Sequence, residues 1–568
     1  MAVRHLTRIL LGGRLQTHPT SLWDVGSWLD SALRVSAVMV LIGLVGCGSN
    51  GGADGGSDVG PSPATSAGQS GQQLPPRVSV SPLQATVAKN GTVAFSAIVT
   101  GAGGGVAWSV EGGSSNGTVN AGGAYTAPSV VPDAPVIVRA TSVADARGTA
   151  TATVRVIVGE TLTANPNRAL SPGGATANTF SGGQRSVAVS GSTVYMVWND
   201  NHTGDENVYL AVSRDRGITI GAPIRVNDDV TTAPQLAPSV AVDGAGRAVI
   251  AWLDGRWNLD PTFDVYVATV AVDATGAVTV GPNQRVTGVG THESRDPSVA
   301  LALDRSGNAY LAWGDGTSGD TDVVLTKGSR LASGQFNFAP PVKVHENYTS
   351  DQSRPSLAVD ATGYVVVAWN DRQPIVDQDV YWRRGRFSAT GAIEWTTPTE
   401  VRVNLQTDGD QVSPSVAVDQ NAVAYVAWGQ QVGLERRKLY LAQSDRSDLS
   451  VDANTEVLPS VDADQNFPSL IVHGDEITVA FADNRECPAC GFDPFNPKGT
   501  GPTDVYLVRS VDGGATFGAS LPVNDDQLAL ALHGRASVAV DDVGRAYVVW
   551  TDARNGPSQA QAFMARVE

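Results

Sequence analysis

"RPSLAVDATGYVVVAWND", residues 354–371, indicates the fold most clearly, because variants of this stretch recur along the chain. Each copy holds two short runs rich in Val and Ala, separated by a turn that contains Gly, Asp or Asn. Runs of this kind are typical of neighbouring strands. The other copies begin near residues 185, 237, 296, 413, 467 and 535. Internal repetition of this kind indicates a repeat architecture.

An anchor aromatic closes the second strand of every copy, at intervals of 53 to 69 residues. A third strand follows in each copy and a fourth in most, and four antiparallel strands make one propeller blade. The sequence therefore predicts an all-β, seven-bladed β-propeller over residues 158–568. The last copy reaches Glu568 after its third strand, so we expect residues 159–171 to supply the missing strand and cover the free sheet edge. The anchors are Trp198, Trp252, Trp313, Trp369, Trp428, Phe481 and Trp550.

Residues 77–157 show strand-length runs with Gly and Asn turns, which suits a β-sandwich. The segments "GTVAFSA", "WSV" and "YTAP" and the closing "ATATVRV" resemble bacterial Ig-like domains. This resemblance implies a spacer or adhesive module with Trp108 in its core.

The N-terminus has the pattern of a targeting segment. Residues 35–46 are twelve uncharged, mostly apolar residues, too few to span a bilayer. Leu44 to Cys47 resembles the lipobox of bacterial lipoproteins, which implies a signal peptide over 1–46 and a lipid on Cys47. An ordinary secretory signal with a chance cysteine is the alternative. Residues 47–76 are rich in Gly, Ser and Pro and are expected to form a disordered tether. The resemblance implies an extracytoplasmic protein anchored in the bacterial cell envelope.

The formal net charge is −17, and Lys and Arg form no dense cluster. Nucleic acid is therefore not an expected partner, because phosphate binding needs a basic surface. No cofactor and no metal site is expected either, since the histidines are scattered along the chain.

"SVDGGATF", residues 510–517, fits the pattern Ser-x-Asp-x-Gly-x-Thr-aromatic. It resembles the Asp box, or BNR repeat, of the sialidase superfamily, and "SRDRGITI", residues 213–220, is a second copy. We expect polar side chains of the box to bond turn amides, a glycine to take a positive φ, and the aromatic to pack inward. The box therefore indicates fold rather than catalysis. The box positions are Ser510, Asp512, Gly514, Thr516 and Phe517, and Ser213, Asp215, Gly217 and Thr219.

Two further features repeat with the blades. A serine recurs in every inner strand, and we expect it to hydrogen-bond a neighbouring blade near the axis. Asp-x-Arg or Asp-Arg pairs begin several loops after the second strand. They predict either a salt-bridged loop brace or a polar ring that binds an anionic or sugar ligand. The pairs are Asp254/Arg256, Asp371/Arg372, Asp483/Arg485 and Asp552/Arg554.

The loop "ADNRECPACGFDPFNPKGTGPTD", residues 482–504, is longer than its counterparts, and long loops on rigid scaffolds are candidate binding sites. Cys487 and Cys490 are expected to form a disulfide that closes it. A redox or zinc site is the less favoured alternative. Arg485, Phe492 and Phe495 are its candidate contact residues.

Sialidase chemistry needs three arginines that clamp a carboxylate, a Tyr–Glu nucleophile pair and an Asp acid/base. Arg295, Arg354 and Arg535 precede inner strands and are the candidates for the clamp, and Glu346 and Tyr348, in a loop between blades, are the candidates for the pair. The family's Phe/Tyr-Arg-Ile-Pro motif is missing, however, since that region reads "SGGQRSVAVS". The leading hypothesis is a non-catalytic platform for a glycan or protein at the cell surface. An exo-sialidase or other glycoside hydrolase and a structural envelope protein are the alternatives.

Overall fold

A computed structural model gives the fold of this chain, and its described residues contain strands and two short 3₁₀ turns but no α-helix. No helix in that part is long and apolar enough to cross a membrane. The turns are η1 (Gly113–Asn116) and η2 (Pro557–Gln559). The described residues are 75–101, 103–159, 162–174, 176–180, 183–257, 262–286, 291–292, 298–316, 320–346, 350–372, 377–433, 436–444, 450–451, 453–487, 502–526 and 531–568.

Residues 77–157 form three small sheets around one hydrophobic core. Tyr125, Val138 and Val154 are fully buried at its centre. Trp108 packs against this core and against Phe95 but is only partly buried, so it borders the core instead of filling it. The strands are β1 (Arg77–Ser81) with β4 (Ser96–Thr100); β2 (Gln84–Ala88), β9 (Thr149–Ile157), β8 (Val136–Ser142) and β5 (Val106–Val110); and β3 (Thr92–Ala94), β7 (Ala124–Thr126) and β6 (Thr118–Val119).

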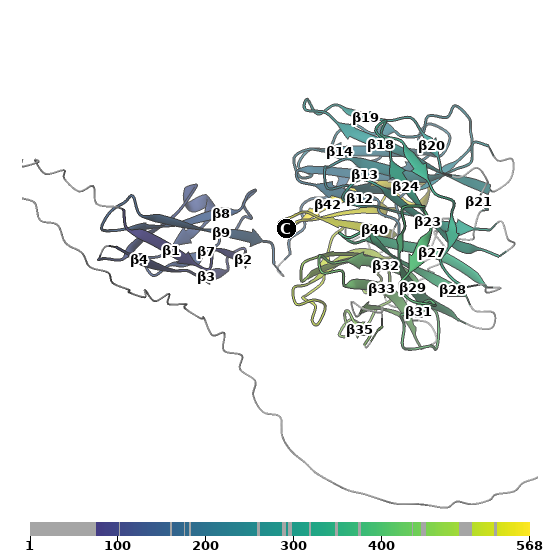
Figure 1. Cartoon of the computed structure of the whole chain (residues 1–568). Coiled ribbons are helices and arrows are strands. Elements are labelled where there is room, and N and C mark those ends of the chain that lie inside the picture. Colours follow the sequence, from purple (N-terminus) through teal and green to yellow (C-terminus); the bar gives the residue numbers. More distant parts are fainter. Residues whose placement is uncertain are drawn as a thin grey trace, which may run out of the picture. The chain divides into compact units, whose positions relative to one another are not determined.

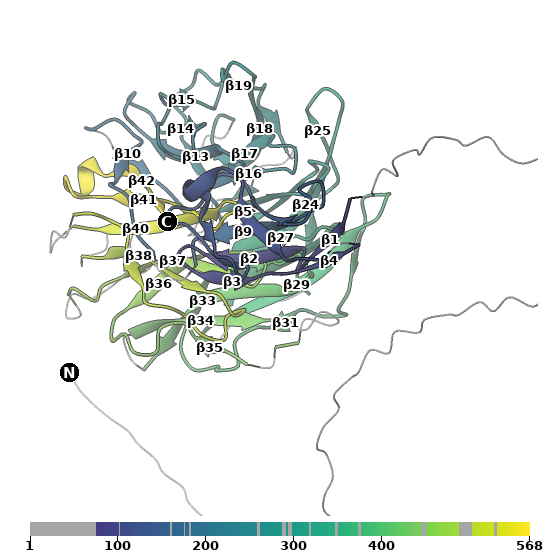
Figure 2. The same cartoon turned by 90° about the vertical axis from the view of Figure 1, so that its left-hand side faces the viewer.

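The described part of residues 164–568 holds seven antiparallel sheets, which Figure 2 shows one after another around a common centre. The first is β11 (Ala177–Asn178), β12 (Val187–Ser190), β13 (Thr193–Asp200), β14 (Asn207–Ser213) and β15 (Ile224–Arg225). The second is β16 (Gln235–Val242), β17 (Ala248–Asp254), β18 (Thr262–Val272), β19 (Val278–Val280), β20 (Gln284–Arg285) and β21 (Thr291–His292). The third is β22 (Val299–Leu303), β23 (Ala309–Asp315), β24 (Asp322–Arg330), β25 (Phe336–Phe338) and β26 (Val342–Lys343).

The remaining four sheets follow in chain order. The fourth is β27 (Asp351–Val359), β28 (Tyr364–Arg372), β29 (Gln378–Phe387), β30 (Ile393–Trp395) and β31 (Val401–Arg402). The fifth is β32 (Gln411–Val418), β33 (Ala424–Val432), β34 (Arg436–Gln443) and β35 (Thr455–Glu456). The sixth is β36 (Gln465–His473), β37 (Glu476–Asp483), β38 (Asp504–Ser510) and β39 (Leu521–Pro522). The seventh is β40 (His533–Val540), β41 (Ala546–Asp552), β42 (Gln561–Val567) and β10 (Arg168–Ala169).

The innermost strands close a ring. β12 contacts β16, and contacts continue through β22, β27, β32, β36 and β40 back to β12. The predicted closing strand is present, since β10 pairs with β42 over Arg168 and Ala169. Figure 1 shows the same sheets from the side, so the architecture is all-β and propeller-like.

Each sheet packs on the preceding one through its anchor aromatic. The anchors are buried, and most stack on an aromatic of the third strand, as Trp252 does on Tyr266 with ring centroids 6.0 Å apart. Burying a ring of this size removes a large apolar surface from water, so the anchors hold neighbouring sheets together.

The predicted role of the repeated serines is confirmed where their bonds are resolved. The Oγ of Ser356 accepts a hydrogen bond from Val416 N–H of the next sheet at 2.8 Å, and Ser415 accepts one from Leu470 N–H at 2.9 Å. Ser239, Ser469 and Ser537 make equivalent bonds to other sheets. These ring serines are Ser186, Ser239, Ser298, Ser356, Ser415, Ser469 and Ser537.

Candidate functional site at the centre of the ring

Five inner strands begin with the same irregularity. In each, the register shifts by a β-bulge just before the ring serine. The residue two positions before the serine has a φ between 51° and 58°, a region that side chains other than glycine rarely occupy. Such strain concentrates at binding and active sites. The bulge residues are Ala237, Arg354, Ser413, Phe467 and Arg535.

Three bulge side chains from consecutive sheets touch one another. The Arg354 guanidinium donates a hydrogen bond from Nη1 to Ser413 Oγ at 2.6 Å and lies over the Phe467 ring, 5.9 Å from its centroid. Arg535 lies over the ring of Phe180 at 5.5 Å. We call Arg354, Ser413, Phe467 and Arg535 the mouth cluster, because they lie where the loops between sheets converge.

The mouth cluster is electrostatically positive. Burial, together with the positive charges of Arg535 and Arg437, lowers the pKa of Arg354 to about 9. Burial also lowers the pKa of Arg535. Among the described residues, no carboxylate pairs with Arg535. Desolvated like charges repel one another, so an anion entering the cluster would relieve this repulsion.

A third arginine crosses the centre of the ring below the cluster. Arg185 donates from Nη2 to the carbonyl oxygens of Val416 and Leu470, at 3.2 and 3.3 Å, in the fifth and sixth sheets. Burial lowers its pKa to about 10. These two bonds attach one nitrogen of the Arg185 guanidinium to the inner strands of the fifth and sixth sheets.

Between the sixth and seventh sheets, His533 lies among carboxylates. Its Nε2 is 3.0 Å from Asp526 and 3.5 Å from Asp552, and its Nδ1 is 3.4 Å from Asp504. Burial alone would lower the pKa of His533, but hydrogen bonds to the three carboxylates outweigh it and raise the pKa to about 11. The imidazole is therefore cationic at neutral pH and unsuited to act as a general base.

His533 occupies a position that holds glutamine in four other sheets. His533, the first residue of β40, pairs with Asp552 in the adjacent strand. In four other sheets the residue at the His533 position pairs in the same way with the residue at the Asp552 position. The four glutamines are Gln235, Gln352, Gln411 and Gln465. Asp526, His533 and Asp552 are also the one group in the described residues that could hold a metal ion, with ligand atoms within 4.8 Å. The imidazolium and the Arg554 guanidinium, which lies 3.1 Å from Asp526 and 2.7 Å from Asp552, together neutralise these carboxylates, so the arrangement fits a buried charge network better than a metal site.

The repeated Asp–Arg pairs form loop braces in three of four copies. Arg485 donates to both oxygens of Asp483, donates to Ser520 Oγ, and stacks over the Tyr506 ring at 3.7 Å. Arg256 and Arg554 make matching bonds to Asp254 and Asp552. The brace prediction is confirmed for these pairs, and Arg485 therefore serves its own loop. The fourth pair differs: Asp371 accepts hydrogen bonds from Ser350 and Gln352, and Arg372 is exposed.

The structure brings two of the five predicted sialidase residues together, Arg354 and Arg535. Glu346 forms an ion pair with Arg383 at 3.2 Å, and in the described part no bond joins it to either arginine. Arg295 and Tyr348 lie outside the described residues, as do Cys47, Cys490, Phe492 and Phe495. Cys487 is disulfide-bonded.

Both Asp boxes have the expected geometry. Ser510 Oγ donates to Asp512 and accepts from Gly514 N–H, while Thr516 donates from its N–H and hydroxyl to the same carboxylate. Gly514 has a φ of 89°, and Phe517 packs against a hydrophobic cluster. Ser213, Asp215, Gly217 and Thr219 repeat these bonds. The boxes lie between third and fourth strands, at the strand ends away from the mouth cluster, and their polar groups are used within the turns.

Sequence reasoning did not single out Arg185 or His533. The signal for both lay in the alignment of the repeats. Arg185 stands where five copies have proline, and His533 stands where four copies have glutamine.

No protein-family model and no curated protein matches the chain. Solved structures do. An ulvan lyase of a new polysaccharide lyase family, bound to GlcA(1-4)Rha3S, is 13% identical, with 69% of this chain and 94% of that chain covered and a TM-score of 0.44. The phage phi92 endosialidase is 10% identical, with coverages of 70% and 69% and a TM-score of 0.41. The Penicillium chrysogenum α-L-arabinanase complexed with arabinobiose is 16% identical, with coverages of 58% and 92% and a TM-score of 0.39. These three are glycan-processing enzymes, but likeness at this level carries no argument about activity.

Proposed function

We propose that this protein recognises a carboxylate-bearing glycan at the mouth cluster. The observation that carries the proposal is a pair of half-buried arginines, Arg354 and Arg535, at bulge positions of the fourth and seventh sheets. Ser413 fixes the Arg354 guanidinium, and the positive charge of Arg535 acts on it. A carboxylate accepts bidentate hydrogen bonds from guanidinium groups, and such bonds are strong where water is excluded.

The other members of the cluster suit a sugar. The Phe467 ring offers an apolar surface, and the buried Ser413 hydroxyl accepts a hydrogen bond from Arg354 and so holds its guanidinium in place. Both are bulge residues on rigid inner strands. The ligand contacts are therefore held in place before binding, which reduces the entropy lost on association.

Turnover of the bound glycan, by an exo-sialidase or other glycoside hydrolase, is the second candidate function. The same arginine pair supports it, because Arg354 and Arg535 are two of the three residues expected to clamp the substrate. The non-catalytic platform and the enzyme thus share one binding site and differ in whether the glycan is cleaved.

The test combines a binding assay with a turnover assay. The wild type, Arg354→Gln and Arg535→Gln are titrated calorimetrically with sialyllactose and with a glucuronate-terminated oligosaccharide. Arg214→Gln is the matched control, since Arg214 is exposed at an Asp-box turn. We expect both mouth variants to lose at least tenfold in affinity, about 1.4 kcal/mol, and the control to bind normally. Affinities of the two mouth variants equal to that of the wild type would contradict the proposal. Release of free sugar by the wild type would show that the protein cleaves the glycan.

The organisation around this site is proposed from the sequence patterns and supported by the sheets described above. The seven sheets would be the seven blades of one propeller over 158–568, and 77–157 would be an Ig-like module. A signal peptide over 1–46, a lipid on Cys47 and a tether over 47–76 would anchor the protein in the bacterial cell envelope. Metabolic labelling with palmitate, lost in Cys47→Ser, tests the anchor.

A further inference from the structure

Arginines of the third strand fill grooves between neighbouring sheets at the ends away from the mouth cluster. Arg384 donates from Nη1 to Ala422 O in the next sheet at 3.3 Å and from Nη2 to Asp360 at 2.6 Å. Arg509 donates from Nη2 to Gly544 O in the next sheet at 2.6 Å. Ala422 and Gly544 hold the same position in the turn between the first two strands of their sheets. These two grooves are therefore closed by a guanidinium.

The groove between the third and fourth sheets lacks this closure. In β24, Lys327 lies three residues after Val324, which pairs with the anchor aromatic Trp313. Arg384 and Arg509 occupy the same position in their own sheets. The Lys327 side chain is shorter and has no guanidinium fork. A cavity of about 240 Å³ is present there, and the turn residue Gly363 lines it, at the position of Ala422 and Gly544. The shorter Lys327 side chain leaves part of this groove open.

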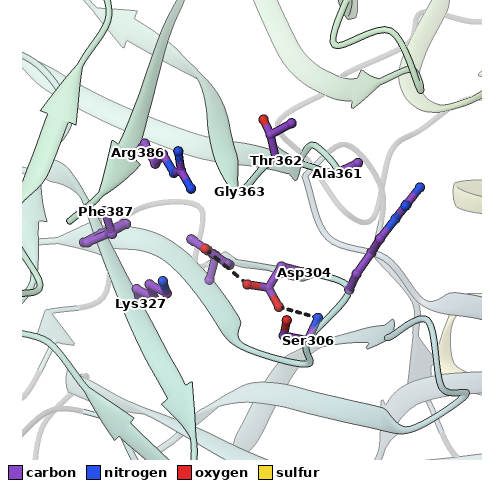
Figure 3. Close-up of a pocket in the computed structure, with 10 residues that line it drawn as sticks. Asp304, Ser306, Lys327, Ala361, Thr362, Gly363, Arg386 and Phe387 are labelled. Carbon is purple, nitrogen blue, oxygen red and sulfur yellow. Dashed lines mark hydrogen bonds between the residues drawn. The ribbon is translucent and has the colours of Figure 1, made fainter. Parts of the chain in front are cut away.

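Cations surround the cavity. Lys327, Arg386 and Arg305 line it from β24, β29 and the turn after β22. Figure 3 shows Lys327 and Arg386 on one side, and Asp304 and Ser306 on the other. Among the described residues, none of the three cations forms a hydrogen bond or ion pair. Lys327 contacts the Tyr310 ring at 5.5 Å, and Arg386 contacts the Tyr364 ring at 5.6 Å.

The acidic residue of the cavity does not neutralise these cations. Asp304 accepts hydrogen bonds from Ser306 N–H, Asn308 N–H, Asn308 Nδ2 and the Tyr310 hydroxyl, all within its own sheet. Its role matches that of Asp360, which holds the turn of the next sheet. The cavity thus has three unpaired cations in a chain whose net charge is −17.

We propose that this cavity is a binding site for a small oxyanion, a sulfate or phosphate group that is either free or carried on a sugar. Cations approach from three directions, which suits an anion that accepts hydrogen bonds on several oxygens. The volume is below the roughly 300–1,000 Å³ of pockets for drug-sized ligands, so it fits one such group with at most part of a sugar ring. The site is separate from the mouth cluster and does not depend on the proposed function.

Calorimetric titration at low ionic strength tests the site, with inorganic sulfate, inorganic phosphate, galactose 6-sulfate and unmodified galactose as separate ligands. The variants are Lys327→Ala, which removes a charge, and Lys327→Arg, which keeps the charge but fills the groove as Arg384 does. Arg214→Gln is the control, because it removes an exposed charge outside the cavity.

We expect at least one charged ligand to bind the wild type and the control, and both Lys327 variants to lose tenfold or more. Galactose 6-sulfate as the tightest ligand would assign the site to a sulfated sugar, and equal binding of the inorganic ions would assign it to the free anion. Absence of binding by all charged ligands would overturn the proposal. Undiminished affinity in Lys327→Arg, with thermal unfolding showing a folded variant, would overturn it as well.

Discussion

Replacing His533 by glutamine should remove a pH dependence from the stability of the propeller-like region. Glutamine is the natural choice, because Gln235, Gln352, Gln411 and Gln465 occupy the same register position in other sheets. Its amide can still donate to Asp552 or Asp526, but it does not titrate. Alanine would instead leave Arg554 as the remaining cation beside Asp526 and Asp552 and would remove their hydrogen-bond partner.

The sign and size of the effect follow from the raised pKa of His533, about 11 in the folded protein against 6.5 for the ordinary side chain. The contribution of His533 to stability is fully present below pH 6.5 and declines as the pH rises toward 11. Between pH 7 and pH 9 the folded state holds one proton more than the unfolded state, so wild-type stability falls by about 1.4 kcal/mol per pH unit relative to the variant. Over this range the difference amounts to about 3 kcal/mol.

The assay is urea unfolding at pH 7, 8 and 9, followed by the fluorescence of the buried tryptophans, for wild type and His533→Gln. The free-energy difference between the two proteins should shrink steadily as the pH rises. Parallel pH profiles, with a difference constant to within about 0.5 kcal/mol, would refute the charge network.

Three further outcomes are expected. Arg535→Gln should leave the melting temperature unchanged or raised, because it removes a like charge from beside Arg354; a clear fall in a thermal scan would contradict this. Asp512→Asn should lower the melting temperature at neutral pH. Hydrogen bonds to Thr516 and Ser510 lower the pKa of Asp512 to about 2, so the stabilisation by its carboxylate disappears as the pH falls through that value. The substitution should therefore have no effect in strong acid. Differential scanning calorimetry at pH 7 and near pH 2 measures it, with a pH-independent difference as the contrary result. Trp369→Ala should destabilise by about 3–5 kcal/mol, since the fully buried ring leaves a cavity between sheets, whereas a loss under 1 kcal/mol in urea unfolding would contradict the packing.

The repeated features of the fold could be predicted from the sequence because each one appears several times. The ring serines, the anchor aromatics and the Asp boxes follow a pattern with a physical reason, and one copy supports the next. The closing strand β10 was predictable for another reason, since the last repeat lacks a fourth strand before Glu568.

Single departures from the repeat were harder to interpret. Lys327 gives no signal of its own until Arg384 and Arg509 show that a longer cation at this register position can reach the next sheet. Arg185 gave no local signal, because its partners Val416 and Leu470 are more than 230 residues away. The convergence of Arg354, Ser413 and Phe467 likewise needs the ring to close before their distances are known.

The most direct test of the central claim is the affinity of the wild-type protein for a glucuronate-terminated oligosaccharide against that for its methyl ester, which has the same shape without the charge. If the mouth cluster binds a carboxylate through Arg354 and Arg535, the ester should bind at least tenfold more weakly, and Arg535→Gln should abolish this difference. Equal affinities of acid and ester for the wild type would contradict the claim.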